Sequence, residues 1–136
     1  MKLINCVAKL LSFSVCSCAV YAADVPVKII AFNDFHGQLE APGSLRANAA
    51  TATPTIPVGG VEWMAAYVDL LKAKNPHNVV VSAGDLIGAT PLISALFHDE
   101  PTIEAMNRLG LEFNAVGNHE FDEGREELLR MQNGGC

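Results

Sequence analysis

Three polar clusters in this sequence contain the residue types that bind divalent metal ions and transfer protons. Asp34 and His36 stand two residues apart, Asp85 stands by itself near the middle of the chain, and Asn118 directly precedes His119. A carboxylate combined with an imidazole suits zinc, manganese, iron or cobalt better than calcium. Each cluster alone is more typical of a solvated turn, because Asp and Asn are common turn residues. The clusters therefore gain meaning only if the fold brings them together.

The spacing within each cluster predicts how its side chains point. We expect Asp34 and His36 on an extended segment, where residues two apart face the same side and can bind one ion. In an extended segment the adjacent Asn118 and His119 would diverge, so that the Asn118 amide oxygen faces a metal and His119 faces a substrate. Asp122 can hold the His119 ring through a hydrogen bond and favour its protonated form. Asp122 is equally suited to cap the helix that follows it.

The segments around these clusters alternate between strands and helices. Short runs rich in branched and aromatic residues predict two buried strands, at 27–32 and 79–82, and a third strand at 113–116. Apolar residues at helical spacing predict three helices, at 61–74, 101–109 and 122–131. Gly110 is expected to end the second of these helices. Residues 41–57 are rich in Ala, Thr and Pro, which predicts an exposed loop.

This alternation predicts an α/β fold with a mostly parallel sheet layered with helices. Ligands in such folds bind beyond the carboxyl ends of the strands, and each polar cluster follows a predicted strand. Because three strands all end in potential ligand residues, one shared site explains the clusters better than three separate turns. Two divalent ions bridged by one carboxylate would clamp a phosphate and activate a water, and their charge would reverse the field of an acidic site. A protonated His119 would stabilise charge on the phosphoryl oxygens or the leaving group.

The composition is that of one globular domain preceded by a removable leader. The chain has 136 residues, of which 50% are hydrophobic and 18% charged, and its formal net charge of −6 argues against a nucleic-acid polymer as partner. Residues 1–22 combine lysines, an apolar stretch too short for a permanent membrane span, and small residues at the end. This pattern predicts a signal peptide and export to the periplasm or the cell exterior. Cys18 is not expected to carry a lipid anchor, because Cys16 and Ser17 directly before it match a lipidation motif poorly.

The three clusters resemble the opening motifs of the secreted 5′-nucleotidases, within the calcineurin-like metallophosphoesterases. The similarity covers about residues 27–136 and is carried by Asn33-Asp34-Phe35-His36-Gly37-Gln38-Leu39, Gly84-Asp85 and Gly117-Asn118-His119-Glu120-Phe121-Asp122. The resemblance implies that Asp34 and His36 hold a first metal ion, that Asp85 bridges two ions and that Asn118 holds the second. It also implies that His119 and Asp122 form the catalytic dyad.

The same resemblance implies parts that follow these residues in the family. These are a C-terminal domain that binds the nucleoside and further metal ligands, two His and a Gln. Counted independently of the family, the candidate ligands here give three to one ion and two to the other, too few to hold both tightly. We therefore expect residues 23–136 to be the N-terminal part of a metallophosphoesterase domain with little activity by itself. Cys136 would then pair with a cysteine further along the parent protein.

The expected activity of the parent protein is metal-dependent hydrolysis of nucleotide phosphate esters. Its cofactors would be two divalent ions, with Zn, Mn, Co and Mg as candidates. Two alternatives stay open: a metallophosphoesterase acting on nucleotide sugars, cyclic nucleotides or sulfur esters, and a non-catalytic exported binding module.

The remaining candidate residues fit simpler roles. Gly88 could let backbone amides approach a phosphate, although an ordinary loop glycine is the simpler interpretation. Residues at helical spacing on one face of the first helix are expected to pack against the core rather than to bind a base, namely Trp63, Tyr67 and Leu70. His77 and His98 are expected to be solvated.

Overall fold

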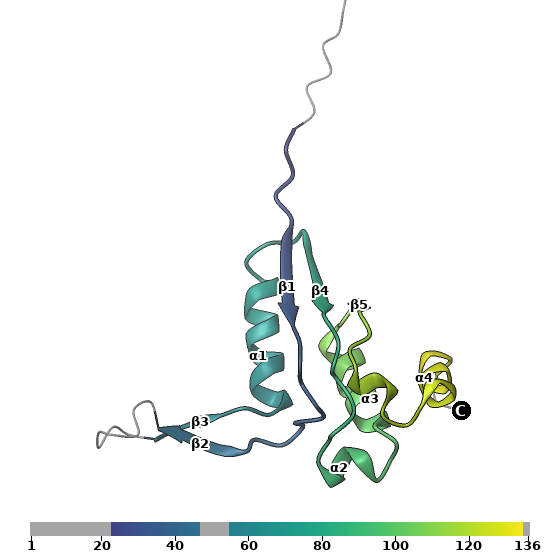
Figure 1. Ribbon diagram of the computed structural model, residues 1–136. Coiled ribbons are helices and arrows are strands. Elements are labelled where there is room, and N and C mark those ends of the chain that lie inside the picture. The colour runs from purple at the N-terminus through teal and green to yellow at the C-terminus, as the bar shows by residue number, and fades with distance from the viewer. Residues whose placement is uncertain (1–22, 47–54, 135–136) are drawn as a thin grey trace, which may run out of the picture.

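The structure is a computed structural model that describes residues 23–46 and 55–134 (Figure 1). The expected signal peptide at 1–22 and Cys136 lie outside the described residues. In chain order the elements are β1 (Lys28–Phe32), β2 (Gly43–Arg46), β3 (Thr55–Val58), α1 (Val61–Lys72), β4 (Asn78–Ser82), α2 (Leu92–Ala95), α3 (Glu100–Leu109), β5 (Phe113–Asn114), the 3-10 helix η1 (His119–Phe121) and α4 (Arg125–Gln132). The predicted α/β alternation is confirmed.

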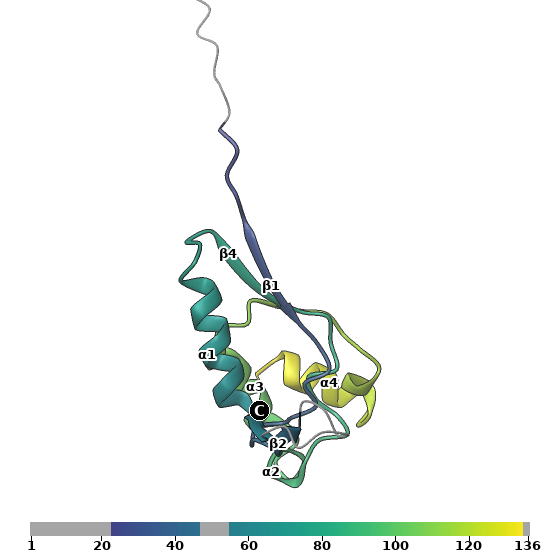
Figure 2. The ribbon, with the colours of Figure 1, turned by 90° about the vertical axis from the view of Figure 1, so that its left-hand side faces the viewer.

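Strands β1, β4 and β5 form a parallel sheet in that order. Phe32 pairs with Ser82, and Ser82 pairs with Asn114, so the three strands end at the same level. Because the strand order follows the chain order and crossovers between parallel strands are right-handed, α1 and α3 must cover the same face of the sheet. Figure 2 shows both helices on one side of β1 and β4. The loops that follow the strands therefore all emerge at one edge.

The hydrophobic core lies between the sheet and these two helices. Ile30 of β1, Val80 of β4, Val68 of α1 and Leu109 of α3 are buried against one another. Side chains alternate along a strand, so Ile29 points to the other face of the sheet and is 68% exposed. Each fully buried aliphatic side chain stabilises the fold by about 1.5–3 kcal/mol. This core holds the strands and helices whose ends carry the polar clusters.

A second buried cluster fixes the loop after β4. Leu86 and Ile87 of this loop are buried against Met106 of α3. The backbone next to Asp85 is therefore anchored by apolar contacts on its C-terminal side. The positive-φ cap of α3 at Gly110 (φ 85°, ψ 35°) confirms the predicted end of that helix.

The expectation of a loop over 41–57 was wrong where the structure describes this region. β2 and β3 pair as an antiparallel hairpin, with Ser44 opposite Pro57, and the hairpin extends away from the sheet (Figure 1). Backbone pairing between two strands does not require large apolar side chains, which is why the composition did not indicate it. The expected exposure is found, since Ile56 is 51% exposed.

Three side chains that were expected to pack are exposed instead. Trp63, Tyr67 and Leu70 of α1 are 45%, 62% and 54% exposed, because the opposite stripe of the helix, with Val68, faces the core.

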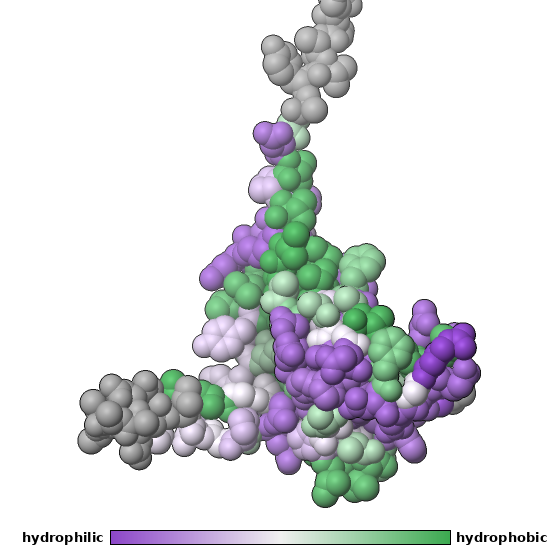
Figure 3. Space-filling model, in the orientation of Figure 1, coloured by the Kyte–Doolittle hydropathy of each residue, from purple (hydrophilic) through white to green (hydrophobic). Residues whose placement is uncertain are grey.

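The short helix α2 was not predicted, and Figure 3 shows hydrophobic side chains gathered over it, where Leu92 is 71% exposed. Among the described residues, every helix is too short or too polar to cross a membrane.

Candidate metal and acid–base site

Backbone hydrogen bonds hold the loop after β1 alongside the loop after β4. The amide of Asp34 donates to the carbonyl of Gly84 (3.1 Å), and the amide of His36 donates to the carbonyl of Asp85 (3.1 Å). These bonds continue the pairing of β1 and β4 beyond the ends of the strands. As a result, the first and second polar clusters lie side by side at the carboxyl edge of the sheet.

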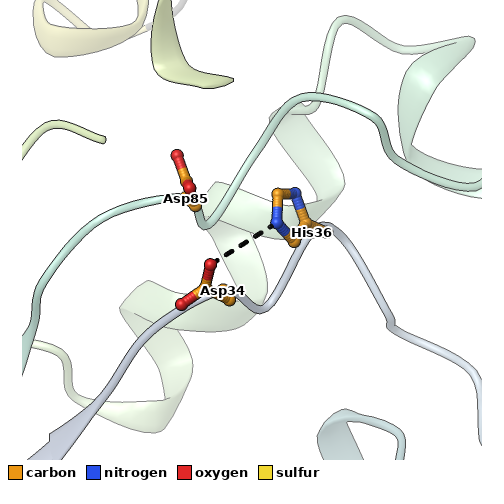
Figure 4. A group of neighbouring side chains, drawn as sticks. All are labelled: Asp34, His36 and Asp85. Atoms are coloured by element: carbon orange, nitrogen blue, oxygen red, sulfur yellow. Dashed lines mark ion pairs between the residues drawn. The ribbon is translucent and has the colours of Figure 1, made fainter. Parts of the chain in front are cut away.

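Asp34, His36 and Asp85 form a group that could hold a metal ion. Each offers one ligand atom, and these atoms lie within 4.8 Å of one another (Figure 4). The His36 Nε2 atom is 3.9 Å from Asp34 Oδ1, with side chains 24% and 57% exposed. Zinc bonds of about 2.0–2.2 Å allow two ligands of one ion to be up to about 4.4 Å apart, so small side-chain movements would bring these three atoms within reach of one ion. Carboxylate and imidazole donors fit the divalent ions that the sequence predicts.

The backbone of this group is not extended, contrary to the expectation for Asp34 and His36. Both residues and Asp85 adopt positive φ angles, of 55°, 45° and 54°. The side chains meet because left-handed turns, rather than a strand, bring them together. Asp and His enter this region more readily than most residues, at a cost of about 1–3 kcal/mol each. Such strain persists only where surrounding contacts enforce the conformation.

His119 and Asp122 form a hydrogen-bonded pair next to this group. His119 is the first residue of η1 and Asp122 directly follows its end, and His119 Nδ1 lies 2.8 Å from Asp122 Oδ2. This hydrogen bond, together with the negative charges of Asp122, Asp85 and Glu120, raises the pKa of His119 above its usual value. The alternative role of Asp122 as a helix N-cap is wrong, because Gly124 occupies that position before α4.

Two contacts join the pair of His119 and Asp122 to the group of Asp34, His36 and Asp85. The backbone amide of His119 donates to Asp85 Oδ1 at 3.0 Å. The rings of His36 and His119 meet edge to face, with centroids 4.8 Å apart and an interplanar angle of 87°. The expected extended conformation at Asn118 is wrong, since its φ of −76° and ψ of −32° are helical. Asn118 is exposed and lies one residue before the amide that binds Asp85.

Glu120 is a residue of this site whose importance the sequence analysis missed. Glu120 is 6% exposed, and its carboxylate accepts hydrogen bonds from the backbone amides of Asp85 (2.9 Å), Leu86 (2.8 Å) and Gly117 (2.6 Å). Hydrogen bonds to an ionised acceptor are about twice as strong as neutral ones. Glu120 therefore ties the loop after β4 to the loop after β5. The one signal in the sequence was its place inside the motif at 117–122.

Gly88 is more than the ordinary loop glycine that was expected. Its φ is 78°, and a Cβ atom there would lie 2.7 Å from Asp122 Oδ2 and 2.8 Å from His119 Cβ. Its amide donates to Asp99 Oδ2 (3.1 Å), so this amide is engaged by protein rather than turned to a phosphate. The absence of a side chain at Gly88 lets the loop after β4 approach the pair of His119 and Asp122.

The two histidines expected to be solvated are exposed. The His98 side chain is 67% exposed and lies 3.4 Å from Glu123, and His77 is exposed on the turn before β4. His98 and Glu123 also come close to Glu127, but Arg130 already binds the Glu127 carboxylate at 2.6 Å. We assign this group no role in the site.

Several proteins are similar to this chain in sequence, although no family model matches it. An uncharacterised protein in the pqq-V 5′ region of Acinetobacter calcoaceticus is 58% identical over 81% of the chain and 56% of its own length. Endonuclease YhcR of Bacillus subtilis is 41% identical over 82% of the chain and 9% of its length. NAD 5′-nucleotidase of Haemophilus influenzae is 34% identical over 79% of the chain and 17% of its length. The chain thus spans less than two thirds of each relative.

The solved structure of Haemophilus influenzae NAD nucleotidase shares this fold. It aligns with a TM-score of 0.68 and 31% identity, over 79% of this chain and 19% of that one. The parallel sheet and its helices are accordingly an α/β domain of the metallophosphoesterase type. The chain is also similar to the N-terminal region of proteins named 5′-nucleotidase, at 33–36% identity.

Proposed function

We propose that this chain carries the metal-binding and acid–base residues of an enzyme that hydrolyses phosphate esters of nucleotides. The observation that carries the proposal is the contact between two sets of side chains. The group of Asp34, His36 and Asp85 adjoins the hydrogen-bonded pair of His119 and Asp122. The names of the 5′-nucleotidase relatives support a nucleotide as the substrate.

In this proposal Asp34 and His36 hold one divalent ion, Asp85 bridges it to a second, and Asn118 contributes to the second. When bound, the ions would supply positive charge against the phosphoryl oxygens and activate a water. The candidate ions stay Zn, Mn, Co and Mg. The ligand atoms of Asp34, His36 and Asp85, within 4.8 Å of one another, support the first of these ions.

The role proposed for His119 is to stabilise charge and transfer a proton. Its Nδ1 is engaged by Asp122, which leaves Nε2 to face the substrate. The raised pKa of His119, caused mainly by its hydrogen bond to Asp122, favours the protonated form of the ring. A protonated Nε2 could donate to a phosphoryl oxygen or to the oxygen of the leaving group.

The remaining proposals concern the parent protein. We infer that residues 1–22 direct export and that residues 23–136 are the N-terminal part of a catalytic domain. Two ions would need more ligands than these four residues provide, so the chain alone would release little phosphate. Residues further along the parent protein would complete the site and bind the nucleoside. Cys136 would pair with one of their cysteines.

The test compares bound metal and phosphate release in Asp85 variants. We expect Asp85→Asn to reduce the Zn or Mn that the chain retains in elemental analysis, because both proposed ions use this carboxylate. In the full-length parent, Asp85→Asn should abolish phosphate release from AMP more completely than Asn118→Ala. Asp69→Asn, in an exposed position of α1, is the matched control and should retain metal and activity. Undiminished metal in Asp85→Asn would refute the proposal.

A second candidate is hydrolysis of phosphodiesters, which the 41% identity to a protein named endonuclease favours. The acidic sequence, with a net charge of −6, opposes a nucleic-acid polymer as substrate. Assays of the parent protein with AMP, a cyclic nucleotide and single-stranded DNA would separate the two. Faster cleavage of DNA than of AMP would favour the second candidate.

A further inference from the structure

The imidazole of His36 is oriented by the peptide of Gly88. His36 Nδ1 lies 3.0 Å from the Gly88 carbonyl oxygen. A carbonyl oxygen can only accept, so Nδ1 must carry the proton in this contact. Nε2, which lies 3.9 Å from Asp34 Oδ1, then keeps its lone pair for a metal ion. The Gly88 carbonyl thus selects the tautomer that a ligand at Nε2 requires.

The Gly88 peptide is in turn held by a buried carboxylate, that of Asp99. The Gly88 amide donates to Asp99 Oδ2 at 3.1 Å, and Asp99 is 7% exposed. The other carboxylate oxygen accepts from Ser94 Oγ at 2.7 Å, and Ser94 Oγ lies 2.6 Å from Thr102 Oγ1. Ser94 and Thr102 are fully buried. All these polar groups are therefore satisfied within the protein, and the network has one defined arrangement.

The conformation of Asp99 indicates that its side chain serves the Gly88 loop rather than its own helix. Asp99 stands at the N-cap of α3, where Asp side chains usually accept an amide of the first turn. Its side chain makes no such bond, and its backbone adopts a φ of 59° and a ψ of 9°. A non-glycine residue pays a conformational penalty for this left-handed geometry. The penalty is offset here by contacts that lead to Gly88.

We propose that Asp99 is a positioning residue for His36, acting through the Gly88 peptide to fix both the orientation and the tautomer of the imidazole. This inference rests on the proposed function in one respect, namely that His36 Nε2 binds a divalent ion. Loss of a partner behind a metal-bound histidine typically lowers metal affinity by about 10–100-fold. A carboxylate that served only to stabilise α3 would leave the His36 ring unchanged.

The test uses three substitutions in the buried network. Asp99→Ala removes the acceptor of the Gly88 amide. Asp99→Asn keeps one side-chain oxygen. We expect this oxygen to go on accepting from the Gly88 amide, which can only donate, while the Ser94 hydroxyl accepts from the new side-chain nitrogen. Ser94→Ala is the matched control, since it breaks a buried bond to Asp99 that does not involve Gly88.

The first measurement is the long-range proton–nitrogen NMR spectrum of the His36 ring in the metal-free chain. We expect the Nδ1-protonated form in the wild type, Asp99→Asn and Ser94→Ala, and a mixture of both tautomers in Asp99→Ala. The second measurement is Zn²⁺ affinity by titration calorimetry. We expect it to fall about 10–100-fold in Asp99→Ala and to stay close to wild type in the other two variants.

Two results would overturn the inference: an unchanged His36 ring in Asp99→Ala, or a change of the same size in Ser94→Ala. If Asp99→Ala lacks the native circular dichroism spectrum, Asp99→Ser replaces it, since a serine there is polar but too short to reach the Gly88 amide. If the wild-type chain binds no Zn²⁺, the proposed function fails. The ring spectrum still decides the positioning role in that case.

Discussion

The tightest steric constraint on the hydrogen-bonded pair of His119 and Asp122 is at Gly88, and replacing Gly88 with alanine should destabilise the protein in two separable ways. The φ of 78° lies in the left-handed region, where an alanine costs about 1–2 kcal/mol. The new Cβ would also lie 2.7 Å from Asp122 Oδ2 and 2.8 Å from His119 Cβ. Overpacking of this kind costs about 1–3 kcal/mol more. Gly88→Ala should therefore lower the free energy of unfolding by about 2–5 kcal/mol.

Gly110 offers the matched control for the conformational part of this cost. It has a φ of 85°, and a Cβ there would meet only the flexible end of the Lys72 side chain, at 2.8 Å. Gly110→Ala should therefore cost only the left-handed penalty of about 1–2 kcal/mol. The difference between the two variants isolates the collision with His119 and Asp122.

The assay is urea unfolding of wild type, Gly88→Ala and Gly110→Ala, followed by circular dichroism. With a urea dependence of about 1–3 kcal/mol per molar, an additional loss of about 2 kcal/mol lowers the midpoint by about 1 M. Equal midpoints for the two variants would refute the argument that Gly88 is required by its neighbours rather than by its backbone conformation. The pKa of His119 gives a second readout, because displacement of Asp122 in Gly88→Ala should lower it.

Two further predictions concern the pair of His119 and Asp122 and the neighbouring Glu120. Because the pKa of folded His119 is raised above 6.5, its interaction with Asp122 stabilises the fold fully below that pH, and the stabilisation is lost as the pH rises through the folded pKa. Asp122→Asn should lower this pKa in an NMR titration, and an unchanged His119 pKa would contradict the assignment. Glu120→Ala should cost about 1–3 kcal/mol for each buried amide it leaves unpaired. Glu112→Ala, which removes an exposed acceptor of one amide, should cost less, and equal losses in urea unfolding would disprove the role of Glu120.

Much of the fold could be predicted from the sequence because it depends on local patterns. The three strands of the sheet follow from short runs of branched residues, and α1 and α3 follow from apolar spacing with Gly110 as a stop. The hairpin of β2 and β3 was missed because its strands are paired through the backbone and exposed. The exposure of Trp63 was also missed, because helical spacing identifies a stripe but not which stripe faces the core.

The candidate site divides in the same way. Residue type and order within the chain were enough to select Asp34, His36, Asp85, Asn118 and His119 as candidates, because ligand chemistry belongs to individual side chains. Their conformations were not predictable, since left-handed turns at the ends of strands are imposed by neighbouring loops. These neighbours are far apart in the sequence, as the amide of Asp34 bonded to Gly84 shows.

What the sequence alone determined was which side chains could bind metal and move protons, and that an α/β sheet would carry them to one edge. What only the tertiary structure decided was how they are held there. The Glu120 carboxylate accepts hydrogen bonds from backbone amides of two loops, and the Asp99 carboxylate, at the start of α3, accepts one from the Gly88 amide. Such buried carboxylates have no local pattern, because their role depends on backbone amides that folding brings within reach.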